Sequence, residues 1–139
     1  MFQPAEEGLA GAKRMLDDGL FERFPCDAIY GIHNSPAVPL GKVRAITGTA
    51  LAAIDYFVVT LRGKSTHGAT PQNGIDTVSI AAQTIGIINA IPSRHVNALD
   101  SAIISIGMIH GGTSNIVIPE TVEIRGSVRT LKPQVRDLV

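Results

Sequence analysis

The sequence predicts a mixed α/β fold, and three patterns carry this prediction. Residues 54–62 and 121–130 alternate between apolar and polar side chains, as strands with one covered face do. Residues 77–91 repeat apolar side chains at the spacing of an amphipathic helix. Residues 102–109 are apolar at nearly every position, which is typical of a central strand or of one covered on both faces.

The first part of the chain predicts a short helix followed by short strands. The helix covers residues 9–17, and Gly19 stands where a left-handed residue would end it. Residues 27–33 are expected to form a short buried strand that ends at His33, and residues 42–47 are compatible with another strand.

The rest of the chain predicts the order strand, helix, strand, strand and the start of a second helix. Asp76 or Thr77 is expected to cap the first helix and Pro92 to end it, while Lys132 and Pro133 open the second. The side chains expected to face the core are Phe57, Val59, Leu61, Val78, Ala81, Ala82, Ile85, Ile88, Val122, Ile124 and Val128.

This order is the β-α-β-β arrangement of a ferredoxin-like domain whose last helix has barely begun and whose last strand is absent. Because the missing parts are needed to cover the apolar sheet, the chain is expected to be a fragment. The expected domains are residues 1–47, part of an α/β domain, and residues 48–139, an incomplete ferredoxin-like domain.

Composition excludes several classes of protein. The 139 residues carry 12 Lys and Arg against 12 Asp and Glu, and this balance argues against nucleic acid or an anionic membrane as a partner. No apolar run reaches the roughly 18–20 residues of a membrane span, and the start of the chain lacks the pattern of a signal peptide. A single cysteine, Cys26, fits a reducing compartment, and it is expected to be a buried, inert thiol. We therefore expect a cytoplasmic protein.

Two adjacent carboxylates, Glu6 and Glu7, and the later His33 are the candidate metal-site residues. Neighbouring side chains point in different directions, so one carboxylate can bind a cation while the other takes a proton from bound water. Taken alone, two solvated glutamates and a structural histidine are the more common interpretation, because a catalytic zinc needs three or more protein ligands.

His67 is the candidate catalytic histidine of the second domain. It lies in a polar, glycine-flanked loop, where binding and catalytic residues concentrate. The alternative is an exposed loop histidine without a role. His95 and His110 lie near turns and are assigned no chemistry.

Six segments in order carry a family resemblance: Phe2-Gln3-Pro4-Ala5-Glu6-Glu7-Gly8, Asp18-Gly19-Leu20-Phe21, Gly31-Ile32-His33-Asn34, Thr66-His67-Gly68-Ala69-Thr70-Pro71, Ile109-His110-Gly111-Gly112-Thr113 and Arg125-Gly126-Ser127-Val128-Arg129-Thr130. Together they resemble the hippurate hydrolase and N-acyl-amino-acid amidohydrolase family, within the aminoacylase and carboxypeptidase group of dinuclear metallopeptidases. The resemblance runs from Phe2 to the end of the chain.

The resemblance implies a role for each candidate. Glu6 would be the general base, Glu7 and His33 metal ligands, and His67 a donor that reaches the active site of a neighbouring subunit and supports the developing oxyanion. It also implies a zinc-peptidase-like catalytic domain, a lid or dimerisation domain in residues 48–139, and a homodimer. Two divalent ions per subunit are implied, with zinc favoured and manganese, cobalt or nickel as alternatives. The implied reaction is hydrolysis of an N-acyl amino acid.

The sequence departs from the family pattern in three places. Ser35 stands where the family has an aromatic residue, and the remaining metal ligands lie in segments that this sequence does not contain. The family asparagine before Val-Ile-Pro falls on Ile116, with Asn115 one position early, so an extended segment would turn its side chain to the opposite face.

Two other functions stay open. A fragment with two ligands is expected to be inactive and to bind metal weakly, so a non-catalytic association module is the alternative. A stand-alone ferredoxin-like sensor of small molecules is disfavoured, because it leaves residues 2–33 without a purpose.

Overall fold

The computed structural model describes residues 2–6, 8 and 11–139, which belong to two compact units. The first unit ends at Arg44 and the second begins at Ala45. Each unit is described by itself.

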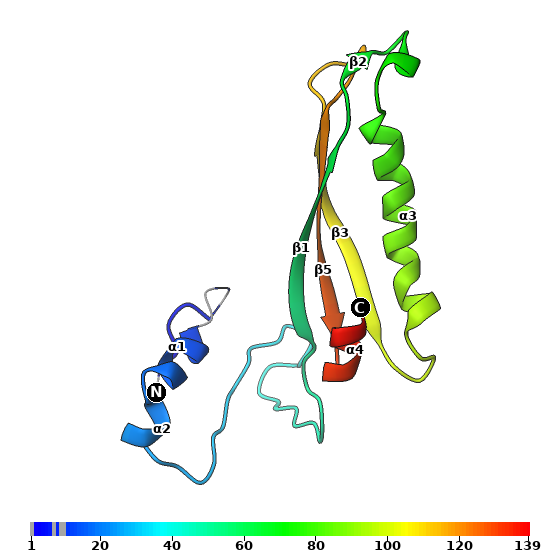
Figure 1. Cartoon of the computed structure of the whole chain (residues 1–139). Helices are drawn as coiled ribbons and strands as arrows, with labels where there is room; N and C mark the ends of the chain where they lie inside the picture. The colour runs from blue at the N-terminus through cyan, green and yellow to red at the C-terminus, as the bar shows by residue number, and fades with distance from the viewer. Residues whose placement is uncertain (1, 7, 9–10) are drawn as a thin grey trace. The chain divides into compact units, whose positions relative to one another are not determined.

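The second unit is a three-stranded antiparallel sheet with a long helix along it (Figure 1). The strand order is β1-β5-β3, and a second, two-stranded sheet joins β2 to β4. The elements are β1 Ala53–Arg62, β2 Thr66–His67, the 3-10 turn η1 Pro71–Asn73, α3 Thr77–His95, β3 Ala102–Gly111, β4 Val117–Ile118, β5 Thr121–Thr130 and α4 Pro133–Leu138. The predicted β-α-β-β order is therefore confirmed.

The core lies where the central strand β5 faces α3. Ile124 is 0% exposed, and it forms a cluster with Val122 and Ala81. The partly buried side chains that pack against this cluster are Val59, Leu61, Ile85 and Ile106. Alternation in β1 and β5 thus predicted the covered face correctly, because each strand has a single face toward the helix.

Three expectations for this unit were wrong. β3 is an edge strand and not a central one, and its register shifts between Ile106 and Met108. Val78 and Ala82 are exposed, whereas Thr77 is buried at the start of α3. The helix also continues through Pro92 to His95. The ring removes one backbone donor near the end of the helix, but the Pro92 carbonyl still accepts a hydrogen bond from the backbone N–H of Val96.

The sheet face opposite α3 is left open by the part of the chain that the structure describes. Tyr56, Val58 and Met108 are 76%, 54% and 49% exposed on this face. Between them, Nε of Arg125 donates to the Glu123 carboxylate at 2.6 Å. This bond, with a smaller effect from His110, lowers the pKa of Glu123.

The described residues of the first unit form two short helices, α1 Gly11–Asp17 and α2 Leu20–Arg23. Gly19 between them has φ 81°, the left-handed conformation predicted there. The strands expected at residues 27–33 and 42–47 do not form, and Ile32 is fully exposed. A strand needs a hydrogen-bonding neighbour, and the described residues of this unit offer none.

Two further observations concern the described residues as a whole. Cys26 is exposed, so the expectation of a buried thiol was wrong, and the strand expected after it does not form. None of the helices in the described part of the chain is both long and apolar enough to cross a membrane.

Candidate functional site

His67 lies on β2, the strand that the loop after β1 contributes to the small sheet. It pairs with Val117 of β4, and the backbone N–H of the following Gly68 donates to the Ile116 carbonyl at 2.8 Å. A side-chain Cβ at position 68 would lie 3.2 Å from that carbonyl oxygen, so a glycine suits this close approach. Backbone pairing therefore fixes the position of His67, while its ring stays exposed.

The His67 ring has a defined polarity. The backbone N–H of Ala69 donates to Nδ1 at 3.1 Å. Because a ring nitrogen that accepts a hydrogen bond carries no proton, the neutral imidazole must carry its proton on Nε2. His67 can thus present an N–H donor at its exposed end.

The His33 ring has the opposite polarity. Its Nδ1 lies 2.6 Å from the backbone carbonyl oxygen of Asn34. A carbonyl can only accept, so in the neutral ring Nδ1 carries the proton and Nε2 keeps a lone pair. Histidines that bind metals usually donate their other ring N–H in this way.

The remaining candidates are less defined. Glu6 is exposed, and Glu7 lies outside the described residues. Among the residues that the structure describes, no three His, Cys, Asp or Glu side chains lie close enough together to hold a metal ion. The donor chemistry of His33 fits a divalent metal, but His33 and Glu6 do not make a closed site by themselves.

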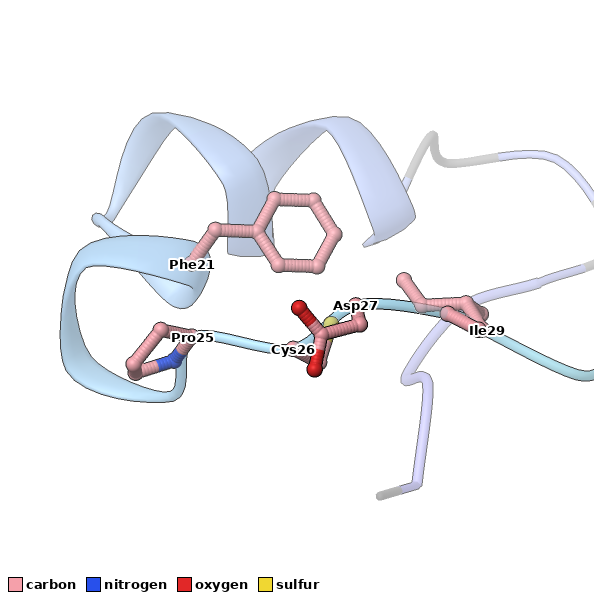
Figure 2. Close-up of a pocket in the computed structure, with 6 residues that line it drawn as sticks. Phe21, Pro25, Cys26, Asp27 and Ile29 are labelled. Atoms are coloured by element: carbon pink, nitrogen blue, oxygen red, sulfur yellow. The ribbon is translucent and has the colours of Figure 1, made fainter.

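Two shallow hollows mark the described surface. Figure 2 shows the first, where Phe21 of α2 faces the segment that carries Cys26 and Asp27, without His33 or Glu6 among its lining residues. The second lies at the end of the sheet near β2 and β4. Its lining residues are Gly68, Asp76, Val78, Gly111, Gly112, Ser114, Asn115, Val117, Ile118 and Pro119. Asn115 therefore shares a hollow with the residue after His67.

Sequence patterns missed the groups that hold the His67 ring. Backbone N–H groups leave no signal in a sequence. The two threonines that flank the loop, Thr66 and Thr70, are a weak signal, because their hydroxyls can bond to nearby backbone.

Comparison with known proteins gives these features a context. The model of the peptidase dimerisation domain family matches residues 49–139. An N-acetyl-L-cysteine deacetylase of Bacillus subtilis is 45% identical over 139 residues, which is 100% of this chain and 33% of that protein. An N-acetyldiaminopimelate deacetylase of Listeria monocytogenes is 37% identical over 100% of this chain and 38% of its own length. The chain thus spans about a third of the length of these curated relatives.

Solved structures agree with this assignment. A dinuclear metal-binding peptidase of the M20 family from Bacillus subtilis is 33% identical, with a TM-score of 0.68 over 98% of this chain and 32% of that one. A proposed aminohydrolase from methicillin-resistant Staphylococcus aureus is 28% identical, with a TM-score of 0.86 over 98% of this chain and 36% of that one. The fold of the second unit is accordingly a partial ferredoxin-like dimerisation domain. Since the family model covers more than half of the sequence, the chain belongs to the M20 peptidase family, with the peptidase dimerisation domain in residues 49–139.

Proposed function

We propose that this chain acts as part of a metal-dependent amidohydrolase that cleaves N-acyl amino acids. Residues 1–47 would belong to its catalytic domain and residues 48–139 to its lid or dimerisation domain. The relatives named above as deacetylases, which match along the whole chain, support this proposal.

The single observation that carries the proposal is the opposite polarity of the two histidine rings. His33 keeps a lone pair on Nε2, as a metal ligand requires. His67 keeps a proton on Nε2, as a donor to an oxyanion requires. Local hydrogen bonds thus suit each imidazole to the role that the family resemblance implies for it.

Glu7 and His33 would hold metal together with residues from other parts of the enzyme. Two divalent ions, with zinc favoured and manganese, cobalt or nickel as alternatives, would supply Lewis acidity toward the amide carbonyl and the attacking water. Glu6 would take the proton of that water and pass it to the leaving amine. His67 of a neighbouring subunit would donate from Nε2 to the carbonyl oxygen as negative charge develops there.

The proposal also concerns which N-acyl amino acid is the substrate. Hippurate and similar N-acyl amino acids are one choice, while the names of the relatives favour N-acetyl amino acids. The test is steady-state hydrolysis of hippurate, N-acetylcysteine and N-acetyldiaminopimelate by the complete enzyme with added divalent metal. Hydrolysis of any of the three supports the amidohydrolase, and the highest kcat/KM identifies the preferred substrate among them. If none of the three is hydrolysed, the proposal is contradicted.

Variants test the roles. Glu6→Gln should lower kcat by about 10²–10⁴-fold, because the general base is lost. His67→Ala should lower kcat by about 10²–10³-fold, with a smaller effect on KM. His95→Ala, at the far end of α3, is the matched histidine control and should keep the wild-type rate. Unchanged kcat in either active-site variant would remove that residue from the mechanism.

The second candidate function is a non-catalytic association module, and the exposed edge of β3 favours it. The chain would then pair with another copy without contributing to catalysis. Wild-type turnover by the complete enzyme carrying both Glu6→Gln and His67→Ala, together with an intact dimer in sedimentation, would favour this function over the first.

A further inference from the structure

The loop that follows His67 is closed by the side chain of Thr66. The Thr66 hydroxyl donates to the backbone carbonyl of Thr70 at 3.0 Å, across the turn. Within the same turn, the backbone N–H of Thr70 donates to the carbonyl of His67 at 2.9 Å, and its hydroxyl reaches that oxygen at 3.3 Å. These bonds tie both ends of residues 66–70 together.

Thr66 is itself held in one orientation. Its backbone pairs with Ile118 of β4, and its side chain is half-buried. A Cβ added to Gly74 would lie 2.6 Å from the Thr66 methyl group, so this methyl packs directly on the Gly74 backbone. Because Thr is branched at Cβ, fixing its methyl group also fixes the direction of its hydroxyl.

The closed turn is what brings an N–H group to the His67 ring. The Ala69 N–H donates to Nδ1, and Ala69 lies between His67 and Thr70 in the turn. The Thr66 hydroxyl holds the Thr70 end of this turn. The ring itself is exposed, so close packing does not orient it. If the turn opens, Nδ1 loses its donor and Nε2 its fixed direction.

We propose that Thr66 is a positioning residue for His67: its hydroxyl holds the turn in the form in which Ala69 donates to Nδ1 and Nε2–H points outward. The proposal rests on the proposed function, in which this N–H supports an oxyanion. Thr66 acts through the turn and does not touch the substrate.

Two substitutions separate the hydroxyl from the shape of the side chain. Thr66→Val keeps the branch and the packing on Gly74 but removes the hydroxyl. Thr66→Ser keeps the hydroxyl and removes the methyl group. A positioning role through the hydroxyl therefore predicts a defect in Thr66→Val and a smaller one in Thr66→Ser, which keeps the hydroxyl but loses the methyl group that directs it.

The direct test is NMR on the 139-residue chain, at about pH 8.5 where an ordinary imidazole is neutral. The readouts are the scalar coupling across the N–H···N bond between Ala69 and His67 Nδ1, and the exchange rate of the Ala69 amide. Wild type and Thr66→Ser should show the coupling. Thr66→Val should lose it, with Ala69 exchange faster by about tenfold, as expected for loss of one hydrogen bond.

Several outcomes would overturn the proposal. One is the absence of the coupling in the wild-type chain, which needs no variant to fold. Another is a Thr66→Val protein that keeps both the coupling and slow Ala69 exchange. Amide exchange of Val122 and Ile124 in β5 reports whether each variant is folded, so a global loss of structure is distinguished from an open turn.

A kinetic experiment separates a failure of this proposal from a failure of the function on which it rests. In the complete enzyme, Thr66→Val should lower kcat about tenfold and leave KM within about twofold, while Thr66→Ser should lower kcat less than Thr66→Val. If His67→Ala leaves kcat unchanged, the oxyanion role proposed for His67 fails, whereas the NMR result still decides the positioning of the ring. If His67→Ala lowers kcat and Thr66→Val does not, the positioning role fails alone.

Discussion

The Asp55 carboxylate on β1 receives two hydrogen bonds from Arg136 of α4. Nε donates at 2.7 Å and Nη2 at 2.6 Å, which is the two-pronged geometry that favours an arginine over a lysine. The bond from Arg136 lowers the pKa of Asp55, and the charge of the guanidinium adds to this effect. Both side chains are partly exposed, so water and salt screen their attraction.

This pair predicts a modest dependence of stability on acid. Because the pKa of Asp55 is lower in the folded chain, the stabilisation is present above the unfolded value near 3.9 and is lost as pH falls through the folded value. Asp55→Asn should lower Tm at neutral pH by about 1–3 °C. A cycle of Asp55→Asn, Arg136→Gln and the double variant isolates the pair, and strictly additive Tm changes would show that the two residues do not interact.

At the scale of elements, the N-cap of α3 is Asp76, one of the two residues that the sequence predicted as its cap. The Asp76 carboxylate accepts from the Ser79 hydroxyl at 2.6 Å and from the backbone N–H groups of Val78 and Ser79, each at 3.0 Å. These bonds, with the Ser79 hydroxyl first, lower the pKa of Asp76. They satisfy two of the free donors at the start of the helix.

Loss of this cap should be visible in thermal unfolding. Asp76→Ala should lower Tm by about 4–8 °C at neutral pH, because the first turn loses its acceptors. Asp76→Asn, which still accepts from the backbone, is the matched control and should recover most of the loss. The difference in Tm between wild type and Asp76→Asn should shrink as pH falls below about 4, because the Asp76 carboxylate is protonated as pH passes its lowered pKa. A Tm difference that grows toward acid would contradict the cap.

The central strand β5 depends on a glycine where the Phe57 ring crosses it. A Cβ at Gly126 would overlap the Phe57 ring and lie 2.5 Å from the Ser105 carbonyl oxygen of β3. Gly126→Ala should therefore destabilise the fold by roughly 1–3 kcal/mol, as overpacking does. Gly107→Ala on β3, where a Cβ would meet nothing within 4 Å, is the control and should stay within about 0.5 kcal/mol in urea unfolding. Equal effects of the two substitutions would exclude this steric explanation.

The helices and strands with a repeating apolar pattern were predictable from the sequence, but the segments that pack beside them were not. Alternation located β1 and β5 and their covered faces, because each strand has one face toward α3. The apolar run of β3 predicted a central strand, yet β3 lies at the edge of the sheet with Ile103 and Ile109 each 55% exposed. An apolar sequence shows that a strand tends to be covered, but it does not show by which segment.

At the scale of the molecule, the same reasoning explains why the site was only partly predictable. Residues 27–33 have the composition of a buried strand, but Ile32 and Tyr30 are exposed because no strand of the described first unit pairs with them. His67 was predicted to lie in a loop, but it lies on the short strand β2, because its backbone pairs with Val117 of β4. The donor to its ring was not predictable, because a backbone N–H has no residue type.

The dimerisation domain predicts self-association of the chain. No strand among the described residues pairs with the outer edge of β3, and Ile80 and Ile87 expose 41% and 69% of their surface along one flank of α3. Sedimentation velocity should show a monomer that converts to a dimer with rising concentration. Ile87→Glu should weaken the dimer at least about tenfold, because it places a charge in a contact that excludes water.

The control is Asn89→Glu, which lies about 200° further round the helix and should keep the wild-type dimer. A chain that stays monomeric at high concentration would contradict self-association. Equal weakening by both variants would show that α3 as a whole, and not the Ile80 and Ile87 flank, makes the contact.

The last prediction concerns metal binding by the 139 residues alone. The proposed function gives the chain two metal ligands, Glu7 and His33, and a stable zinc site needs three or four. Isothermal titration with zinc should therefore show only weak binding, well above micromolar Kd. The part that His33 contributes should depend on its Nε2 lone pair, because Nδ1 is occupied by the Asn34 carbonyl. His33→Ala should therefore remove most of the heat of zinc binding. His67→Ala and His95→Ala should leave this heat unchanged, since the neutral His67 ring carries its proton on Nε2. Submicromolar binding at a defined stoichiometry would show that the chain already holds a complete site, and equal losses in all three variants would show that zinc binds to exposed imidazoles without selection.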